Sequence, residues 1–325
     1  MSELNKIRVG VLRGGPSGEY EISLQSGATV LENLSKEKYQ PVDIFIDKKG
    51  VWHLHGLTCL PEKAVRHLDV VFNAMHGEYG EDGKVQQILE HFKIPYTGSN
   101  SLSSALAMNK ITSRRIFEKY GLKIARAKML NKQEANFLKI FEIFSLLVKP
   151  LVVKPASAGS SLGVNIVDSM ENFTDALDLA FKYSPNILVE EFVRGREITC
   201  GVVERVGHAS PFALPPIEIR PPTGKFFDYQ AKYDGSTEEI CPAELPEDLS
   251  GLAKKNAISA HQSLGLRHYS RTDMIIGENG DIYVLETNTL PGMTAESLLP
   301  KSVKASGSSL PEFLDHILTL ALNKR

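Results

Sequence analysis

The sequence has few cysteines, no long apolar run and no leader-like start. Its three cysteines, Cys59, Cys200 and Cys241, are odd in number and far apart, which argues against a disulfide framework and a zinc pattern. The most apolar stretch outside the expected strands, 140–148, contains Glu142 and is far shorter than the ~20 residues that span a bilayer. The opening "MSELNKIRVGVL" lacks the apolar core and cleavage site of a signal peptide. We therefore expect a cytoplasmic protein.

An excess of charge of one sign is also missing. The sequence has 37 Lys and Arg against 39 Asp and Glu, a formal net charge of -2, and no block of like charges. This balance gives no electrostatic support for binding nucleic acid or a membrane surface, so we expect neither partner. The length of 325 residues exceeds that of one ordinary core and favours two or three globular domains.

The sequence does contain an alternation of β-branched runs with helical patterns over its first hundred residues. This alternation predicts parallel βαβ units, whose binding sites form at the loops after the strands. From Ser101 the pattern turns helical, with serines expected to cap the start and Gly121 to end the stretch. The expected strands are 7–12, 39–46, 68–75, 145–155, 186–193 and a pair within 270–288; the expected helices are 23–34, 84–92, 101–122, 170–183 and 250–265, with a polar, Pro-rich insertion at 214–247.

The strand pair "SRTDMIIGENGDIYVLETN" carries the pattern of a hairpin. Its Asn279-Gly280 dipeptide is strongly favoured in tight hairpin turns. Side chains alternate along strands, so one side chain in two lies on the same face. This rule predicts two same-face sets, Arg271, Asp273 and Ile275 on the first strand and Ile282, Val284, Glu286 and Asn288 on the second.

Oxygen-bearing side chains are expected to meet at the end of this hairpin. Asp273, Glu286 and Asn288 would supply two carboxylates and an amide oxygen, which are ligands that Mg²⁺ prefers. The alternative is a solvated end of the sheet. The metal site is favoured because the strand is apolar on both faces, which indicates burial, and unpaired buried acids are costly.

A Gly/Ser-rich loop follows Lys154 in "VVKPASAGSSLG". Its backbone amides and hydroxyls are suited to cover phosphates, and the lysine supplies a fixed positive charge. The sequence has no Walker P-loop motif, and a mobile surface loop is an equally good interpretation. Lys149 ends the similar "LLVKP", but only Lys154 leads into the loop, so Lys149 is expected at the surface.

Two further loops follow N-terminal strands. "GGPSGEYEISLQSG" lacks the dinucleotide fingerprint, and its Glu19 and Glu21 either help to start a helix or hold a substrate ammonium group. "AMHGEYGEDG" contains His76 and Asp82, for which a satisfied loop histidine and a helix N-cap are the better interpretations of isolated residues. The spacing suggests no Ser-His-Asp arrangement.

Taken together and in order, these motifs resemble the D-alanine:D-alanine ligases of the ATP-grasp superfamily. The resemblance runs through "GGPSGEYEISLQSG", "HGEYGEDGKVQ", "IPYTGSNSLSSALAMNK" and "RTDMIIGENGDIYVLETNTLPGMTAESLLP", and so covers nearly the whole chain. It implies an α/β fold of three parts: an N-terminal parallel βαβ domain at 1–103, a central α+β domain at 104–190 and a C-terminal α+β domain at 191–325. A lid loop is expected near 222–240.

The resemblance implies that ATP lies between the central and C-terminal parts. It implies that Lys110 and Lys154 contact the phosphates and that the 159–163 loop, with Ser161, covers them. Glu190 would contact the adenine amine and Glu197 the ribose. Asp273, Glu286 and Asn288 of the hairpin would hold two Mg²⁺ ions, which Mn²⁺ can replace.

The resemblance also implies the amino-acid site. The first D-alanine would meet Glu21 through its ammonium group and His76 near its carboxylate, and the oxyanion would meet Arg271 and the Gly292 amide. The second D-alanine or the closed lid would involve Ser297, Lys232 and Tyr233, while Glu21, Ser160 and Tyr233 would be hydrogen-bonded together.

The resemblance implies ATP-dependent joining of two D-alanines through a D-alanyl phosphate, for peptidoglycan precursors. It also implies a homodimer, with ATP and D-alanine as small-molecule partners. Three positions depart from the family pattern, Tyr20, Asn109 and Gln230, and none has a direct chemical role in this interpretation. The alternatives are a D-alanine:D-lactate or D-alanine:D-serine ligase of the same fold, and a non-catalytic ATP-binding protein. The lactate version is disfavoured by Tyr233, and the non-catalytic one by the presence of all the phosphate and metal residues.

Overall fold

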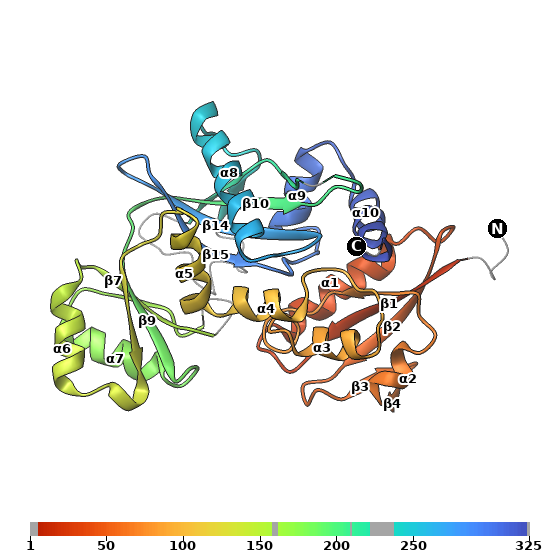
Figure 1. The fold of residues 1–325 in the computed structure, drawn as a ribbon, viewed down its shortest axis with the longest axis horizontal. Helices are drawn as coiled ribbons and strands as arrows, with labels where there is room; N and C mark the ends of the chain where they lie inside the picture. The colour runs from red at the N-terminus through yellow and green to blue at the C-terminus, as the bar shows by residue number, and fades with distance from the viewer. Residues whose placement is uncertain (1–5, 158–161, 209, 222–236, 324–325) are drawn as a thin grey trace.

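The computed structural model describes residues 6–157, 162–208, 210–221 and 237–323 (Figure 1). Three sheets organise these residues. In the view of Figure 1 the central sheet lies at the left, the N-terminal sheet at the right, and the third sheet above and between them. The expected residues Ser160, Ser161, Lys232 and Tyr233 lie outside the described residues.

The N-terminal sheet has the strand order β4-β3-β2-β1-β5. Its β1 strand pairs in parallel with β2 and with β5, which confirms the predicted parallel βαβ arrangement. The short β3–β4 hairpin at its edge was not predicted, because three-residue strands leave almost no periodic signal. The elements are β1 (Ile7–Gly14), α1 (Tyr20–Asn33), β2 (Tyr39–Ile46), β3 (Trp52–Leu54), β4 (Leu57–Cys59), α2 (Pro61–Val65), β5 (Val70–Asn73) and α3 (Lys84–His91).

Two helices, α4 (Ser101–Met108) and α5 (Lys110–Lys119), replace the single helical stretch. The break falls at Asn109, whose backbone is extended and whose side chain accepts hydrogen bonds from the backbone N–H groups of Ile111 and Thr112. The expected serine cap is wrong, because Asn100 caps α4. Gly121 does follow the end of α5, with φ +76°.

The central sheet is antiparallel with the order β6-β9-β7-β8, and α7 packs against it with α6 beside α7. The expected strand at 145–155 is only partly confirmed. Residues 151–155 form β7, but Ser145 and Leu146 end α6, because an apolar run of this length fits a helix as well as a strand. The elements are β6 (Ala127–Asn131), a 3₁₀ turn (Lys132–Glu134), α6 (Phe137–Leu146), β7 (Leu151–Pro155), β8 (Asn165–Val167), α7 (Met170–Ala180) and β9 (Asn186–Glu191).

The third sheet has the order β13-β12-β10-β14-β15, and β11 also pairs with β10. Helix α8 packs against β10, β14 and β15. Strands β12 and β13 correct the expectation of a continuous insertion at 214–247. The elements are β10 (Gly195–Val203), β11 (Phe212–Ala213), β12 (Ile217–Arg220), β13 (Glu238–Ile240), α8 (Glu247–Ser263), β14 (Tyr269–Gly277), β15 (Ile282–Asn288), α9 (Leu298–Ala305) and α10 (Leu310–Leu322).

The β14–β15 hairpin forms as predicted, but its register contains an irregularity that alternation did not foresee. Met274 pairs with Val284 and Asp273 with Glu286, so Leu285 has no opposite residue. Such a bulge moves the following side chains to the other face. Ile282 and Val284 therefore pack into the core with α8, while Glu286 and Asn288 share the face of Arg271 and Asp273; the single four-residue face expected for β15 is wrong.

One core joins the two ends of the chain. It contains side chains of β1, β5 and α1 together with Leu290, Met293 and residues of α9 and α10. Helix α10 contacts both α1 and β5 (Figure 1). The C-terminal segment is thereby packed on the N-terminal sheet, and the domain limits at 103 and 190 stay predictions. No helix among the described residues is long and apolar enough to cross a membrane.

Candidate active site

Two cavities lie on either side of the β14–β15 hairpin end. The larger, of about 540 Å³, is bounded by the loops after β1 and β5, by the hairpin and by the segment 290–298. The smaller, of about 100 Å³, lies between the central sheet and the third sheet. Lys110, Asp273 and Glu286 line both, so these three residues form the boundary between the cavities.

Carboxylates and cations alternate at this boundary. The Lys110 Nζ lies 2.8 Å from Glu286 Oε2, and the Arg271 guanidinium donates two hydrogen bonds of 2.9 Å to Asp273. Asp273 also accepts from the Asn288 amide at 3.0 Å and from the Thr199 hydroxyl at 2.5 Å. The carboxylates that sequence analysis placed together are therefore together, each beside a cation.

Both cations keep their protons. Burial by itself lowers the pKa of Lys110 and of Arg271, but the carboxylates of Glu286 and Asp273 respectively outweigh it, and both pKa values are raised. Two fixed positive charges therefore stand at the boundary. They are suited to stabilise negative charge that develops in a reacting group.

A divalent metal ion fits the donor set of this boundary. Among the described residues no group of three or more His, Cys, Asp or Glu side chains is arranged to hold a metal ion, so an ion here would need the Asn288 amide oxygen beside the two carboxylates. Asn288 donates its amide nitrogen to Asp273 in this structure, and turning the amide presents the oxygen instead. Two carboxylates and an amide oxygen are suited to Mg²⁺.

The smaller cavity contains a buried ion cluster around Glu190. Lys154 Nζ lies 2.7 Å from Glu190 Oε2, and Arg114 Nη1 lies 2.6 Å from Glu190 Oε1. Glu197 and the apolar side chains of Leu162, Val164, Phe192 and Ile275 line the same space. A flat apolar ring with polar edges would match these walls.

Arg114 was missed by sequence reasoning, although a signal was present. It follows Lys110 by four residues on α5, and residues four apart lie on the same face of a helix. Lys149, by contrast, is exposed and packs over the Phe144 ring, as its surface interpretation predicted.

Glu19, and not Glu21, lies in the larger cavity. The Glu21 side chain is 70% exposed and lies 3.4 Å from Lys48 Nζ. The expected role of Glu21 is therefore contradicted by its position, and Glu19 lines the cavity instead. The physical reason is that α1 begins at Tyr20, and two residues at the start of a helix point roughly 200° apart.

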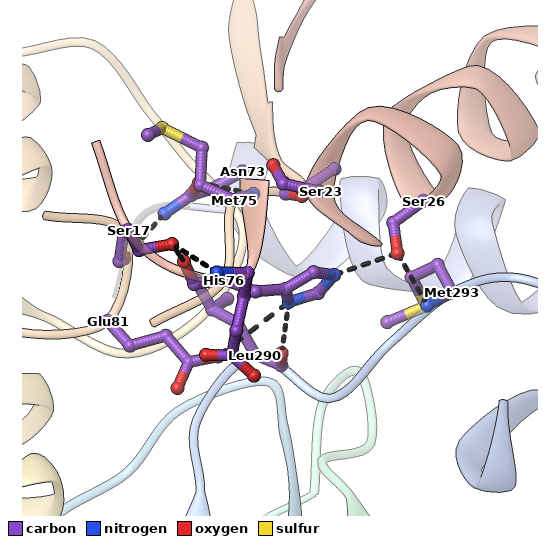
Figure 2. Close-up of polar contacts among 12 residues, drawn as sticks. Ser17, Ser23, Ser26, Asn73, Met75, His76, Glu81, Leu290 and Met293 are labelled. Carbon is purple, nitrogen blue, oxygen red and sulfur yellow. Dashed lines mark hydrogen bonds and ion pairs between the residues drawn. The ribbon is translucent and has the colours of Figure 1, made fainter. Parts of the chain in front are cut away.

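His76 lines the larger cavity, and both of its ring nitrogens have hydrogen-bond partners. Nδ1 is 2.9 Å from the Leu290 carbonyl oxygen and Nε2 is 2.7 Å from the Ser26 hydroxyl (Figure 2). This confirms the interpretation of His76 as a satisfied loop histidine. Since His76 also lines the cavity, its contact with a substrate carboxylate stays a prediction.

Glu81 also lines the larger cavity, although sequence analysis assigned it no role. Its Oε1 lies 3.7 Å from His76 Nδ1. Burial raises the pKa of Glu81 to about 7, the nearby His76 ring opposes the rise, and the charge of Glu19 adds to it. Asp82 is not the N-cap of α3 that the sequence pattern favoured, because the cap residue is Gly83. Asp82 precedes it and accepts a hydrogen bond from the Lys84 backbone N–H.

The segment after β15 forms the remaining wall. Gly292 and Ser297 both line the cavity. A side chain at Gly292 would place its Cβ 2.6 Å from Ser297 Oγ, so the serine hydroxyl would have to turn away to admit it. The Ser297 hydroxyl is hydrogen-bonded to that of Thr294 at 2.8 Å. The predicted residues Arg271, Gly292, Ser297 and His76 are thus brought to one cavity.

Sequence models of one family match almost the whole chain. The model described as D-ala D-ala ligase N-terminus matches residues 8–62 and 58–99, and the model described as D-ala D-ala ligase C-terminus matches residues 116–319. The D-alanine–D-alanine ligase of Geobacter sulfurreducens is 43% identical over 98% of this chain and 95% of its own length. That of Geotalea uraniireducens is 42% identical over 100% and 98%.

Solved structures of similar proteins share the fold. The D-alanine–D-alanine ligase of Bacillus anthracis complexed with ATP has a TM-score of 0.81 and 34% identity, over 97% of both chains. The VanG D-Ala:D-Ser ligase of Enterococcus faecalis has a TM-score of 0.87 and 30% identity, over 97% of this chain and 99% of its own. The D-alanine–D-alanine ligase of Coxiella burnetii has a TM-score of 0.85 and 29% identity, over 98% and 94%.

Proposed function

The chain belongs to the D-alanine–D-alanine ligase family, and from this premise we propose that it joins two D-alanine molecules to D-alanyl-D-alanine while ATP becomes ADP and phosphate. Dipeptide of this kind is a precursor of peptidoglycan. The observation that carries the proposal is the shared boundary of the two cavities at Lys110, Asp273 and Glu286. A nucleotide on one side and an amino acid on the other would meet at these charges.

ATP would occupy the smaller cavity and extend its phosphates to the boundary. The apolar walls suit the adenine ring, with Glu190 near its amine and Glu197 near the ribose. Lys154 and Lys110 would meet the phosphates. Mg²⁺, held by Asp273, Glu286 and Asn288, would supply charge neutralisation for the phosphates. The Bacillus anthracis relative was solved in complex with ATP, which supports ATP as the nucleotide of this site.

In the first step, Glu19 would hold the ammonium group of one D-alanine in the larger cavity. A carboxylate oxygen of this D-alanine attacks the γ-phosphorus, a P–O bond forms, and the bond to ADP breaks. Lys110 and Lys154 offset the charge on the transferred group. The product is D-alanyl phosphate.

In the second step, the free amine of the other D-alanine attacks the carbonyl carbon of this acyl phosphate. The oxyanion that forms would lie near the Arg271 guanidinium and the Gly292 amide, which both line the larger cavity. Donors of this kind would stabilise its negative charge. The C–O bond to phosphate breaks, and a proton of the attacking nitrogen passes to the leaving phosphate. Ser297 lines the cavity near Gly292 and would contact the second D-alanine.

Other parts of the proposal rest on the resemblance alone. A lid that closes over the site through Ser160, Ser161, Lys232 and Tyr233 would exclude water, which hydrolyses acyl phosphates. These four residues lie outside the described part of the chain. A homodimer in the cytoplasm, and the replacement of Mg²⁺ by Mn²⁺, belong to the same proposal.

A D-alanine:D-serine ligase is a second candidate, because the VanG D-Ala:D-Ser ligase has this fold over 97% of the chain. Both candidates form the same acyl phosphate and differ in the second substrate. A similar TM-score for a D-alanine–D-alanine ligase means that the fold does not separate them. The higher identity to D-alanine–D-alanine ligases favours the first.

An assay of ADP release tests the proposal directly. The purified protein is incubated with ATP and Mg²⁺ and with D-alanine, L-alanine, D-serine and D-lactate, each alone and each paired with D-alanine. We expect D-alanine alone to support ADP release with one dipeptide formed per ADP. Absence of D-alanine-dependent ADP release would defeat the proposal, and faster release with D-alanine plus D-serine would favour the second candidate.

A further inference from the structure

A chain of hydrogen bonds joins the N-terminal sheet to the segment that carries Gly292. The Met293 backbone N–H donates to Ser26 Oγ at 3.2 Å, Ser26 Oγ is 2.7 Å from His76 Nε2, and His76 Nδ1 is 2.9 Å from the Leu290 carbonyl oxygen. Figure 2 shows His76 between Ser26 on α1 and Leu290. These hydrogen bonds hold the backbone at residues 290 and 293 against Ser26 and His76.

The direction of each hydrogen bond follows from the atoms. A carbonyl oxygen only accepts, so His76 Nδ1 carries the proton that is donated to Leu290. In the neutral ring Nε2 then accepts, and the Ser26 hydroxyl donates to it. This leaves a lone pair of Ser26 Oγ for the Met293 N–H. Each group is satisfied when His76 is neutral.

A hydrolytic triad is the obvious alternative for a serine, a histidine and the acid Glu81. The geometry argues against it. Ser26 is 0% exposed, so no substrate reaches its hydroxyl. Glu81 lies 3.7 Å from His76 Nδ1, and the proton of that nitrogen is directed to the Leu290 oxygen at 2.9 Å. The group is therefore suited to hold a backbone segment rather than to attack a substrate.

Gly292 lies between the two gripped backbone groups. Its neighbours Leu290 and Met293 are buried in the core that joins the N- and C-terminal segments, which fixes where the segment lies. Hydrophobic packing is non-directional, whereas the hydrogen bonds at 290 and 293 fix how the peptide groups between them are turned. The backbone of His76 is itself held, since Ser17 Oγ donates to its carbonyl oxygen at 2.7 Å.

We propose that Ser26 and His76 form a positioning clamp that aims the Gly292 N–H at the oxyanion of the second step. The proposal rests on the ligase function proposed above. An oxyanion donor acts only if it stands in place before the charge develops, and a misplacement of about 1 Å costs up to ~100-fold in rate. Ser26 is fully buried and is not expected to contact the reacting atoms, so it is a positioning residue.

The chain offers a matched control for Ser26 on the same helix. Ser23 is also 0% exposed, and its hydroxyl contacts the Gly14 N–H at 2.8 Å and the Ala74 carbonyl at 3.0 Å. Both partners belong to the N-terminal sheet region. Ser23→Ala therefore removes an equally buried hydroxyl, while the contact with 290–293 is left intact.

The experiment compares Ser26→Ala with Ser23→Ala in two activity measurements, kcat and the number of dipeptides formed per ADP released. We expect Ser26→Ala to lower kcat about 10- to 100-fold and to lower the dipeptide-to-ADP ratio clearly below one, because slow attack by the amine lets water cleave the acyl phosphate, which returns D-alanine and phosphate. Ser23→Ala should keep the ratio of the wild type. A loss of stability alone lowers both products together and leaves the ratio unchanged.

Hydrogen exchange supplies a readout that does not depend on activity. The Met293 amide should exchange at least tenfold faster in Ser26→Ala than in the wild type and in Ser23→Ala. Equal exchange in the two variants, or an unchanged dipeptide-to-ADP ratio in Ser26→Ala, would overturn the clamp. If the wild type releases no ADP with D-alanine, the proposed ligase function fails. Faster Met293 exchange in Ser26→Ala would then still show that Ser26 holds the segment, but the proposed role in catalysis would be overturned.

Discussion

The two cavities are held together by different interactions. The smaller one is built around Glu190, whose two oxygens face the cations of Lys154 and Arg114, all from residues of the middle of the chain. The larger one needs both ends of the chain, and neutral hydrogen bonds of Ser26 and His76 join them. The difference suggests that the smaller cavity depends on balanced buried charge, whereas the larger depends on the docking of distant segments.

The strongest test of the charge balance is Glu190→Gln. Removing this charge leaves Arg114 and Lys154 buried and facing each other without a carboxylate. We expect the free energy of unfolding to fall by about 3–5 kcal/mol, measured by urea unfolding. The control is Glu191→Gln, since Glu191 is more exposed and lies 3.7 Å from Arg126; its effect should stay below about 1 kcal/mol. Equal losses would mean that the cluster is not decisive.

The boundary between the cavities is tested by Glu286→Gln. The substitution removes a charge from the proposed metal site and from the partner of Lys110. We expect kcat to fall on the order of 10²- to 10³-fold, with the greatest loss at limiting Mg²⁺. Glu278→Gln at the exposed hairpin turn should leave kcat unchanged. Turnover near that of the wild type at limiting Mg²⁺ would remove Glu286 from the site.

The larger cavity is tested by two glutamates at the start of α1, Glu19 at its N-cap and Glu21 in its first turn. Glu19 lines the cavity and Glu21 is turned to solvent. We expect Glu19→Gln to raise the KM for D-alanine about tenfold or more, the size of one charge-assisted hydrogen bond. Glu21→Gln should change it less than about twofold. The reverse result would restore the ammonium role to Glu21.

The last expected effect is a pH dependence of stability from Glu81. Burial raises its pKa from 4.5 in the unfolded chain to about 7, so between these values the folded protein binds more protons than the unfolded one. Its contribution therefore lowers stability as pH rises from 4.5 to 7, by at most about 1.4 kcal/mol per pH unit. Glu81→Gln should remove this slope in melting temperature. An unchanged slope would show that Glu81 does not titrate in this range.

Much of the fold followed from local patterns. The parallel strands β1, β2 and β5, the helices α7 and α8, and the hairpin turn at Gly280 were predictable, because periodicity and turn residues act over a few positions. Where tertiary contacts decide, prediction failed. Of the strand expected at 145–155, only 151–155 forms, since Ser145 and Leu146 end α6 and 147–150 belong to neither a helix nor a strand.

The site shows the same division. Asp273 and Glu286 were placed together from the hairpin register, but the bulge at Leu285 that aims Glu286 and Asn288 away from the core was not foreseen, because alternation assumes an unbroken ladder. The first turn of α1 decided between Glu19 and Glu21. Arg114 needed only its spacing from Lys110.

The sequence by itself determined the class of fold, the order of its motifs and the residue types that the chemistry needs, because these depend on composition and on short-range spacing. Only the tertiary structure decided which of them meet. Ser26, His76 and Leu290 are up to 264 positions apart in the chain, from residue 26 to residue 290, and their contact arises when the C-terminal core packs on the N-terminal sheet. Hydrophobic burial drives that packing without directional preference, and the hydrogen bonds then select one arrangement.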